Sequence, residues 1–154
     1  METSQQLEER LARITSYDDF FEARRHIESN GDPGLFRALW HLALQRTSSG
    51  AAGMAGYLLA ELQPDLDEPL EELLHHVHAS LLDASNKIVP FYLVSQFGRG
   101  RVRQAAAALL ASVPESPRSR VDAVLYWSSF PASKLCKPFH DWEAREMYGV
   151  SDEV

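Results

Sequence analysis

The sequence predicts an all-α protein, and three features lead to that prediction. Apolar residues recur at spacings of three and four along most of the chain, the period of a helix that buries one face. Glycine, proline and short polar stretches interrupt these segments where helices are expected to end. The stretch 86–114, NKIVPFYLVSQFGRGRVRQAAAALLASVP, has two apolar segments joined by Gly98 and Gly100, the pattern of a helical hairpin. We therefore expect about eight helices and no strand.

The N-terminal third contains the clearest helix boundaries. A stripe formed by Leu7, Leu11 and Ile14 predicts a first helix over 4–14. Ser16 is placed as the N-cap of the next helix, with acidic residues in its first turn, where the helix dipole favours them. Asn30 and the glycine after it should end that helix. Asp32, followed by a proline, predicts a third helix that runs to about residue 46.

Further helices follow from the same periodicity. The segment 51–62 contains Gly53 and Gly56, each of which costs a helix about 1 kcal/mol relative to alanine. Close packing against a neighbouring helix is the natural reason for glycine at these positions. Apolar spacing and proline breaks predict the remaining helices at 68–82, 88–97, 102–113, 118–128 and, after Pro138, 138–148.

The length and composition favour one domain over residues 1–154. The chain has 154 residues, and 45% of them are hydrophobic, enough for a core of ordinary size. No run of about 18 uncharged apolar residues is present, and the polar start METSQQLEER does not resemble a signal peptide. We therefore expect a cytoplasmic protein with no membrane segment. A single cysteine, Cys136, excludes an intramolecular disulfide and is interpreted as a small packed thiol.

An internal repeat is suggested by shifting the sequence by fifty residues without a gap. This shift places Gly50 on Gly100, and the apolar positions also coincide, as when Leu59 falls on Leu109. Repeats of this length indicate stacked helical units. The predicted units are about 16–65, 66–115 and a partial one over 116–150.

Three stretches of this register resemble the HEAT and armadillo repeat class. SNGDPGLFRALWHLAL is similar to the first helix of such a repeat, and SGAAGMAGYLLAEL and VRQAAAALLASV are similar to the alanine-rich second helices. The resemblance implies a right-handed α-solenoid whose concave face, lined by the second helices, binds other macromolecules, and it implies no enzymatic activity. The alternative arrangement is a compact bundle of antiparallel helices.

The histidine cluster His75, His76 and His78 is the first candidate for chemistry. The pattern is not HExxH, and the nearest further ligands are carboxylates on the same helix, so a solvated polar face explains it without a metal. Motifs for a serine nucleophile, a dinucleotide and a P-loop are absent, and Asp141 and Glu143 are interpreted as dipole partners in a first turn. We expect neither a metal nor a cofactor.

The charge distribution is more informative. The net charge of −7 argues against nucleic acid as a partner, because phosphate neutralisation supplies most of the affinity for DNA. Six acidic residues and no basic residue lie between positions 61 and 72, whereas arginines gather after position 98. Arginines at a helix start oppose the local dipole and need an offsetting partner. The predicted partner-binding residues are Arg99, Arg101, Arg103 and Arg120.

These features predict a non-enzymatic, acidic protein-interaction module whose partner is another protein. An inhibitor of the bacterial immunity type and an adaptor are both compatible with this prediction. The alternative is an enzyme, either a HEAT-like glycosylase that would use arginines and a tryptophan such as Trp40 or Trp127, or a metal-dependent hydrolase. The acidic balance and the lack of a long basic stripe argue against a DNA glycosylase.

Overall fold

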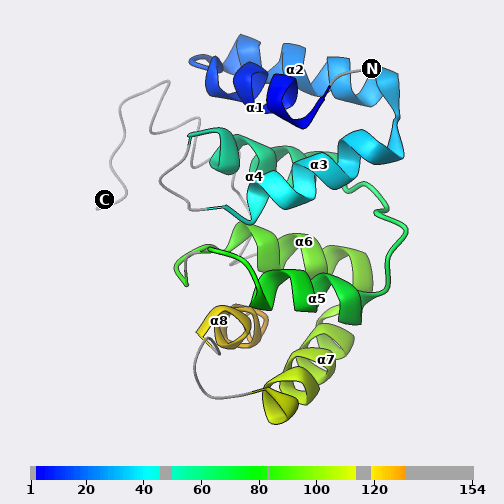
Figure 1. Cartoon of the computed structure of the whole chain (residues 1–154), viewed down its shortest axis with the longest axis vertical. Coiled ribbons are helices and arrows are strands. Elements are labelled where there is room, and N and C mark those ends of the chain that lie inside the picture. The colour runs from blue at the N-terminus through cyan, green and yellow to red at the C-terminus, as the bar shows by residue number, and fades with distance from the viewer. Residues whose placement is uncertain (1–2, 46–49, 83, 114–118, 131–154) are drawn as a thin grey trace.

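A computed structural model describes residues 3–45, 50–82, 84–113 and 119–130. These residues form eight α-helices and no strand, which confirms the prediction of an all-helical chain (Figure 1). The predicted helix 138–148 and Cys136 lie outside the described residues. The helices are α1 (Ser4–Ala12), α2 (Tyr17–Asn30), α3 (Pro33–Ala43), α4 (Gly50–Leu62), α5 (Leu70–His78), α6 (Ile88–Phe97), α7 (Arg99–Ser112) and α8 (Ser119–Trp127).

The predicted caps of α2 and α3 are confirmed. The Ser16 side chain accepts a hydrogen bond from the backbone N–H of Asp19, and Asp32 accepts one from Gly34 at 2.9 Å. Each bond satisfies a backbone donor that has no partner within the first turn. Gly31 ends α2 in the left-handed conformation, with φ of 53°, which glycine adopts without steric cost.

Several helix ends differ from the sequence prediction, since α1 ends at Ala12 and α3 at Ala43, before the predicted ends at 14 and about 46. Two further differences, in α5 and α7, have a clear local cause. α5 spans Leu70–His78, so the prediction of a helix over 68–82 was wrong at both ends. Pro69 occupies the N-cap position, and the Ser80 hydroxyl donates to the carbonyl of Val77 and accepts from the N–H of Leu82. A serine that bonds to the nearby backbone competes with continued helix, which accounts for the early stop.

The second correction concerns the glycine hairpin. α7 begins at Arg99 and not at residue 102, so Gly98 alone separates α6 from α7. Gly98 has φ of 89° and ψ of 144°, a conformation that is largely restricted to glycine, and it separates the two helices within one residue. By contrast, six residues, 44–49, separate α3 from α4. The two hairpins aligned by the fifty-residue shift therefore differ in the length of their connections.

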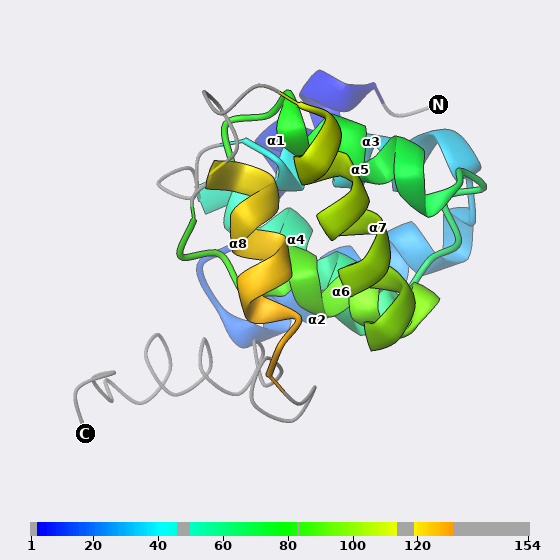
Figure 2. The ribbon, with the colours of Figure 1, turned by 90° about the horizontal axis from the view of Figure 1, so that it is seen from below.

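The helices gather into an upper part, α1 to α4, and a lower part, α5 to α8 (Figure 1). α3 packs along α4, which also contacts α1 and α2, whereas α7 packs against α5 and α8. The junction between the parts is formed largely by α4 and α6. Seen from below, α7 and α8 cover the lower end of the molecule (Figure 2). A continuous core of buried aliphatic and aromatic side chains runs through both parts.

Close packing explains one of the two glycines of α4. A Cβ added at Gly56 would lie 3.3 Å from Cγ2 of Ile88 in α6, so glycine lets these two helices approach closely. Gly53 has nothing within 4 Å of such an atom, and the packing explanation was wrong for it. The requirement for a small residue therefore applies where α4 meets α6.

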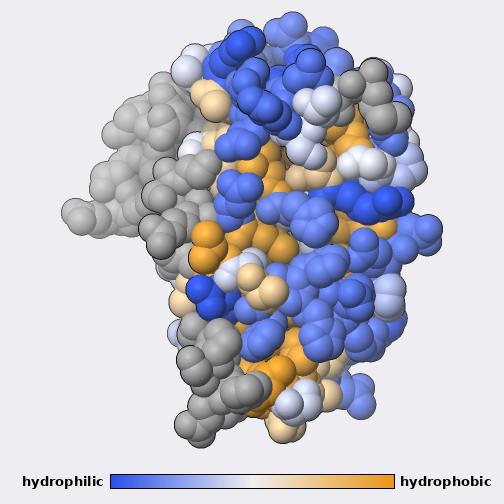
Figure 3. All heavy atoms as spheres, in the orientation of Figure 1, coloured by the Kyte–Doolittle hydropathy of each residue, from blue (hydrophilic) through white to orange (hydrophobic). Residues whose placement is uncertain are grey.

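The surface of the described residues is mainly polar. Hydrophilic residues dominate the face shown in Figure 3, and apolar atoms emerge between them in separate patches. In the described part of the chain, the large apolar side chains that are exposed are Leu81 and Tyr126, at 55% and 57%. Among the described residues, no helix is both long and apolar enough to cross a membrane.

Candidate functional site

The four predicted arginines do not lie on one surface of the molecule: three belong to α7 and Arg120 belongs to α8. Arg99 and Arg103 are four residues apart and project from the same side of α7. Arg101 is two residues from each, a rotation of about 200°, and projects from the opposite side. These three arginines therefore do not form one continuous edge.

Arg99 and Arg103 contact the C-terminal end of α8. Nη1 of Arg103 donates to the carbonyl oxygen of Leu125 at 2.9 Å, and Nη2 of Arg99 donates to that of Ser129 at 2.6 Å. Carbonyl groups at a helix C-terminus carry partial negative charge and attract cations. The α8 terminus thus offsets the unfavourable position of these two arginines at the start of α7, and both hydrogen bonds join α7 to α8.

Arg101 occupies a different environment. Its Nη2 lies 3.9 Å from Oε2 of Glu71, and both side chains are more than half exposed, at 55% and 63%. Such surface ion pairs contribute little, about 0–1 kcal/mol, and exchange partners easily. The guanidinium also lies 5.5 Å from the ring centre of Phe97, within the range of a cation–π contact. Arg101 is therefore held near α5 while its charged end stays accessible.

Arg120 is separate from this group. It lies at the start of α8, about 7.5 Å along the helix axis from Leu125, whose carbonyl Arg103 contacts. Its Nε is buried and has no hydrogen-bond partner among the described residues. Nothing in this geometry joins Arg120 to the surface around Arg101.

A cavity lies beside Arg101, between α5 and α7. Its volume is about 570 Å³, within the range of ligand sites, and both helices contribute apolar and polar groups to its wall. Leu74 and Leu109 provide the larger apolar side chains, and two alanines leave space beside them. The lining residues are Glu71, Leu74 and His75 from α5 and Arg101, Gln104, Ala105, Ala108, Leu109 and Ser112 from α7.

The three histidines of α5 point to different surroundings. His75 lines the α5–α7 cavity, whereas His76 hydrogen-bonds to Trp40 of α3. His78 has a buried Nδ1 that lacks a hydrogen-bond partner among the described residues. Within the part of the chain that the structure describes, no three His, Cys, Asp or Glu side chains are grouped in a way that could hold a metal ion.

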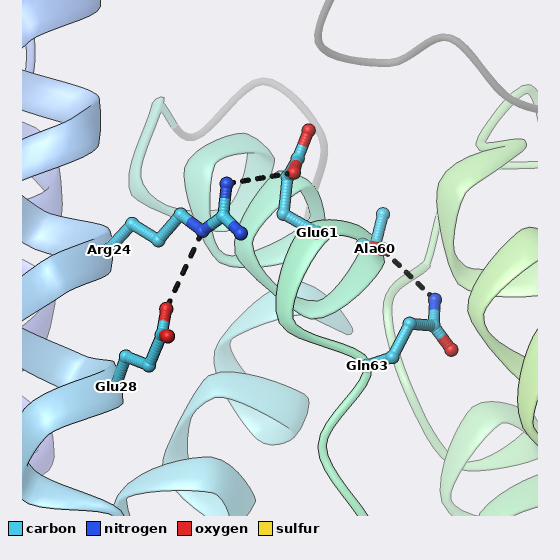
Figure 4. Close-up of polar contacts among 5 residues, drawn as sticks. All are labelled: Arg24, Glu28, Ala60, Glu61 and Gln63. Carbon is cyan, nitrogen blue, oxygen red and sulfur yellow. Dashed lines mark hydrogen bonds and ion pairs between the residues drawn. The ribbon is translucent and has the colours of Figure 1, made fainter.

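The acidic residues between 61 and 72 also have distinct partners. Glu61 accepts a hydrogen bond from Arg24 of α2 at 3.2 Å, and the same arginine lies 3.8 Å from Glu28 (Figure 4). Glu71 faces Arg101, and two further acids, Glu68 and Glu72, face His76. Four acidic residues of this run therefore face different side chains of the same chain.

Sequence reasoning missed one polar network, which joins α3 to α5. Nε1 of the buried Trp40 donates to Nδ1 of His76 at 3.1 Å, and the rings of His41 and His76 lie 5.1 Å apart. Trp40 and His76 are 36 positions apart, and no local pattern connects them. Only the packing of α3 beside α5 brings these side chains together.

Comparisons of the chain with protein-family models, with curated proteins and with solved structures found no match. Assignment of a function therefore rests on the contacts and cavities described above.

Proposed function

We propose that this chain is a non-enzymatic protein-interaction module that binds a segment of another protein in the α5–α7 cavity. In this proposal Arg101 stands at the rim and engages a carboxylate of the partner. The observation that carries the proposal is that Arg101, Ala105 and Ala108 line the same cavity. An accessible cation thus lies beside a wall of small side chains, across from the apolar Leu74.

The chemistry of this cavity suits a peptide segment. Small side chains on α7 let a partner backbone approach closely, and the leucines offer apolar surface to bury. Arginine presents a planar fork that binds carboxylates through two parallel hydrogen bonds. The weak pairing of Arg101 with Glu71 leaves that fork available for exchange.

The wider architecture belongs to the same proposal. We place the chain with the HEAT and armadillo class of α-solenoids, with α4 and α7 as second helices that line a concave face. The fifty-residue register supports this, since it sets Gly50, the first residue of α4, on Gly100, the second residue of α7. The role that we propose is an inhibitor of the immunity type or an adaptor that acts in the cytoplasm.

The test begins with a tagged chain purified from cells that make it naturally, followed by identification of a stoichiometric partner. Affinity for the purified partner is then measured by calorimetry for the wild type and for variants. We expect Arg101→Glu to weaken binding at least tenfold, which corresponds to about 1.4 kcal/mol. Ala108→Trp should abolish binding, because the indole would fill the cavity.

The control is Ala111→Trp, which places the same side chain at another exposed position of α7 that does not line the cavity. It should bind like the wild type. Circular dichroism and the melting temperature should agree among the folded variants. If Ala108→Trp binds normally, or if Ala111→Trp loses binding to the same extent, the cavity is not the binding site.

A further inference from the structure

The polar network between α3 and α5 defines a protonation state. Trp40 is 1% exposed, and its indole N–H donates to Nδ1 of His76 at 3.1 Å. A ring nitrogen that accepts a hydrogen bond carries no proton, so the neutral His76 holds its proton on Nε2. This bond satisfies a buried donor that would otherwise be left without a partner.

Two carboxylates stand beside the same imidazole. Oε2 of Glu68 lies 3.7 Å from Nδ1 of His76, and Oε1 of Glu72 lies 3.9 Å from Nε2. Oε2 of Glu68 is buried and has no hydrogen-bond partner among the described residues. Nδ1 can accept from Trp40 when it is deprotonated, or donate to Glu68 when it is protonated. The two bonds exclude one another.

His41 limits the charge that this network can hold. Its ring lies 5.1 Å from that of His76, at 48°. Burial lowers the pKa of His41, the charge of a protonated His76 lowers it further, and Glu68 acts in the opposite direction. Two imidazolium rings at this distance repel each other, so a charged His76 keeps His41 neutral.

The other elements that pack against α5 lie on its far side. Figure 1 places α3 on one side of α5 and α7 and α8 on the other. Arg101 of α7 pairs with Glu71 of α5. Arg120 and Asp122 belong to α8 and therefore also lie on that far side. Within the described part of the chain, the titratable groups that face His76 are thus Glu68 and Glu72 from its own segment and His41 from α3.

The network also lies at the junction of the two parts of the molecule. The ring of Trp40 contacts that of Tyr92 in α6, with centres 6.0 Å apart. Trp40 therefore links α3 of the upper part to both α5 and α6 of the lower part. Its hydrogen bond to His76 therefore lies between these parts.

We propose that His76 is a proton-sensitive latch that holds the upper and lower parts together through Trp40. On acidification, His76 takes a proton from solvent on Nδ1, releases the Trp40 indole and pairs with Glu68. The buried indole N–H then lacks its partner, and the contact between α3 and α5 loosens.

The first test uses tryptophan fluorescence in a Trp127→Phe, Trp142→Phe background, which retains Trp40. We expect one transition that involves about one proton as the pH falls. His76→Asn should abolish it, because an asparagine oxygen near the position of Nδ1 still accepts from the indole but does not take up a proton. Glu68→Gln should move the midpoint to lower pH, since it removes a charge that favours the imidazolium.

His75→Asn is the matched control. It replaces an exposed histidine of the same helix that lines the α5–α7 cavity, and the transition should remain. A transition that persists in His76→Asn, or one that disappears in His75→Asn, would overturn the proposal.

A second test uses the unmodified protein and does not depend on the folding of any variant. Nitrogen-15 NMR distinguishes the two neutral imidazole tautomers. At alkaline pH His76 should carry its proton on Nε2, and the Trp40 indole proton should show the downfield shift of a hydrogen-bonded group. A His76 ring that carries its proton on Nδ1 under these conditions would refute the latch.

Discussion

The hydroxyl group of Tyr92 offers a sharp test of the packing between the two parts of the molecule. Tyr92 is 1% exposed in α6, and its hydroxyl donates a hydrogen bond to the carbonyl of Pro64, in the segment that connects α4 to α5. Burial raises the pKa of Tyr92, and the nearby charge of Asp65 adds to this effect, so the hydroxyl stays protonated as a donor. Tyr92→Phe removes this donor and leaves the ring in place.

The expected magnitude follows from the burial of both partners. Pro64 is also buried, so its carbonyl would lose this hydrogen bond without ready access to water. Loss of one partner from a buried hydrogen bond costs about 1–3 kcal/mol. For a domain of this size, 1 kcal/mol lowers the melting temperature by about 2–4 °C, so Tyr92→Phe should melt about 2–12 °C below the wild type.

The assay is urea unfolding followed by far-UV circular dichroism, together with calorimetric melting. The matched control is Tyr126→Phe, because Tyr126 is 57% exposed and its hydroxyl can bond to water. The control should change the free energy of unfolding by no more than about 0.5 kcal/mol. Equal unfolding free energies for Tyr92→Phe and the wild type, with the same urea dependence, would refute the proposed contribution of this hydrogen bond.

Three further predictions follow from the structure. Gly98→Ala should destabilise the protein by about 1–3 kcal/mol because φ is 89° there, whereas Gly100→Ala lies inside α7 with open space around the new methyl group and should stabilise the protein by about 0.4–1 kcal/mol. Paired urea titrations would measure both effects, and equal effects of the two substitutions would contradict the prediction. Arg103→Ala should lower the free energy of unfolding by about 1–2 kcal/mol through loss of its bond to the Leu125 carbonyl, and a change in partner affinity without a change in stability would disprove this structural role. A chelator should leave the melting temperature unchanged, because we expect no structural metal. A fall in the melting temperature after removal of a bound zinc, or stoichiometric zinc in untagged protein, would contradict this expectation.

The separation of Arg101 from its neighbours changes how the binding surface should be tested. Replacing Arg101 and Arg103 together would remove a cavity-rim cation and an α8 contact at the same time. A loss of binding in that double variant would then have two explanations. The single substitutions distinguish them, because Arg103 donates to Leu125 and Arg101 borders the cavity.

Local signals in the sequence predicted the helices and several of their ends. Ser16 and Asp32 cap α2 and α3 through bonds to residues three and two positions ahead, and Gly31 ends α2 by its own conformation. Interactions of such short range are encoded within one turn of the chain, so sequence patterns reveal them. The end of α5 was missed because the serine that stops it, Ser80, falls within a continuing apolar stripe.

The candidate site was only partly accessible from the sequence. Charge and alanine content drew attention to the start of α7, and Arg101 does border a cavity there. Helical periodicity places Arg99 and Arg103 on the other side of α7, but it does not reveal that α8 lies there to receive them. The side of a helix on which a residue lies follows from its position in the sequence. The residue that it contacts in another helix depends on how the helices pack.

The sequence by itself determined that this chain is helical, where most helices begin and which faces are apolar, because these properties depend on residues within a few positions of one another. Tertiary packing decided that Trp40 meets His76, that Tyr92 reaches Pro64 and that a cavity opens beside Arg101. Those contacts join residues that are tens of positions apart. They depend on which apolar faces pack together, and many pairings of similar faces satisfy the same hydrophobic pattern.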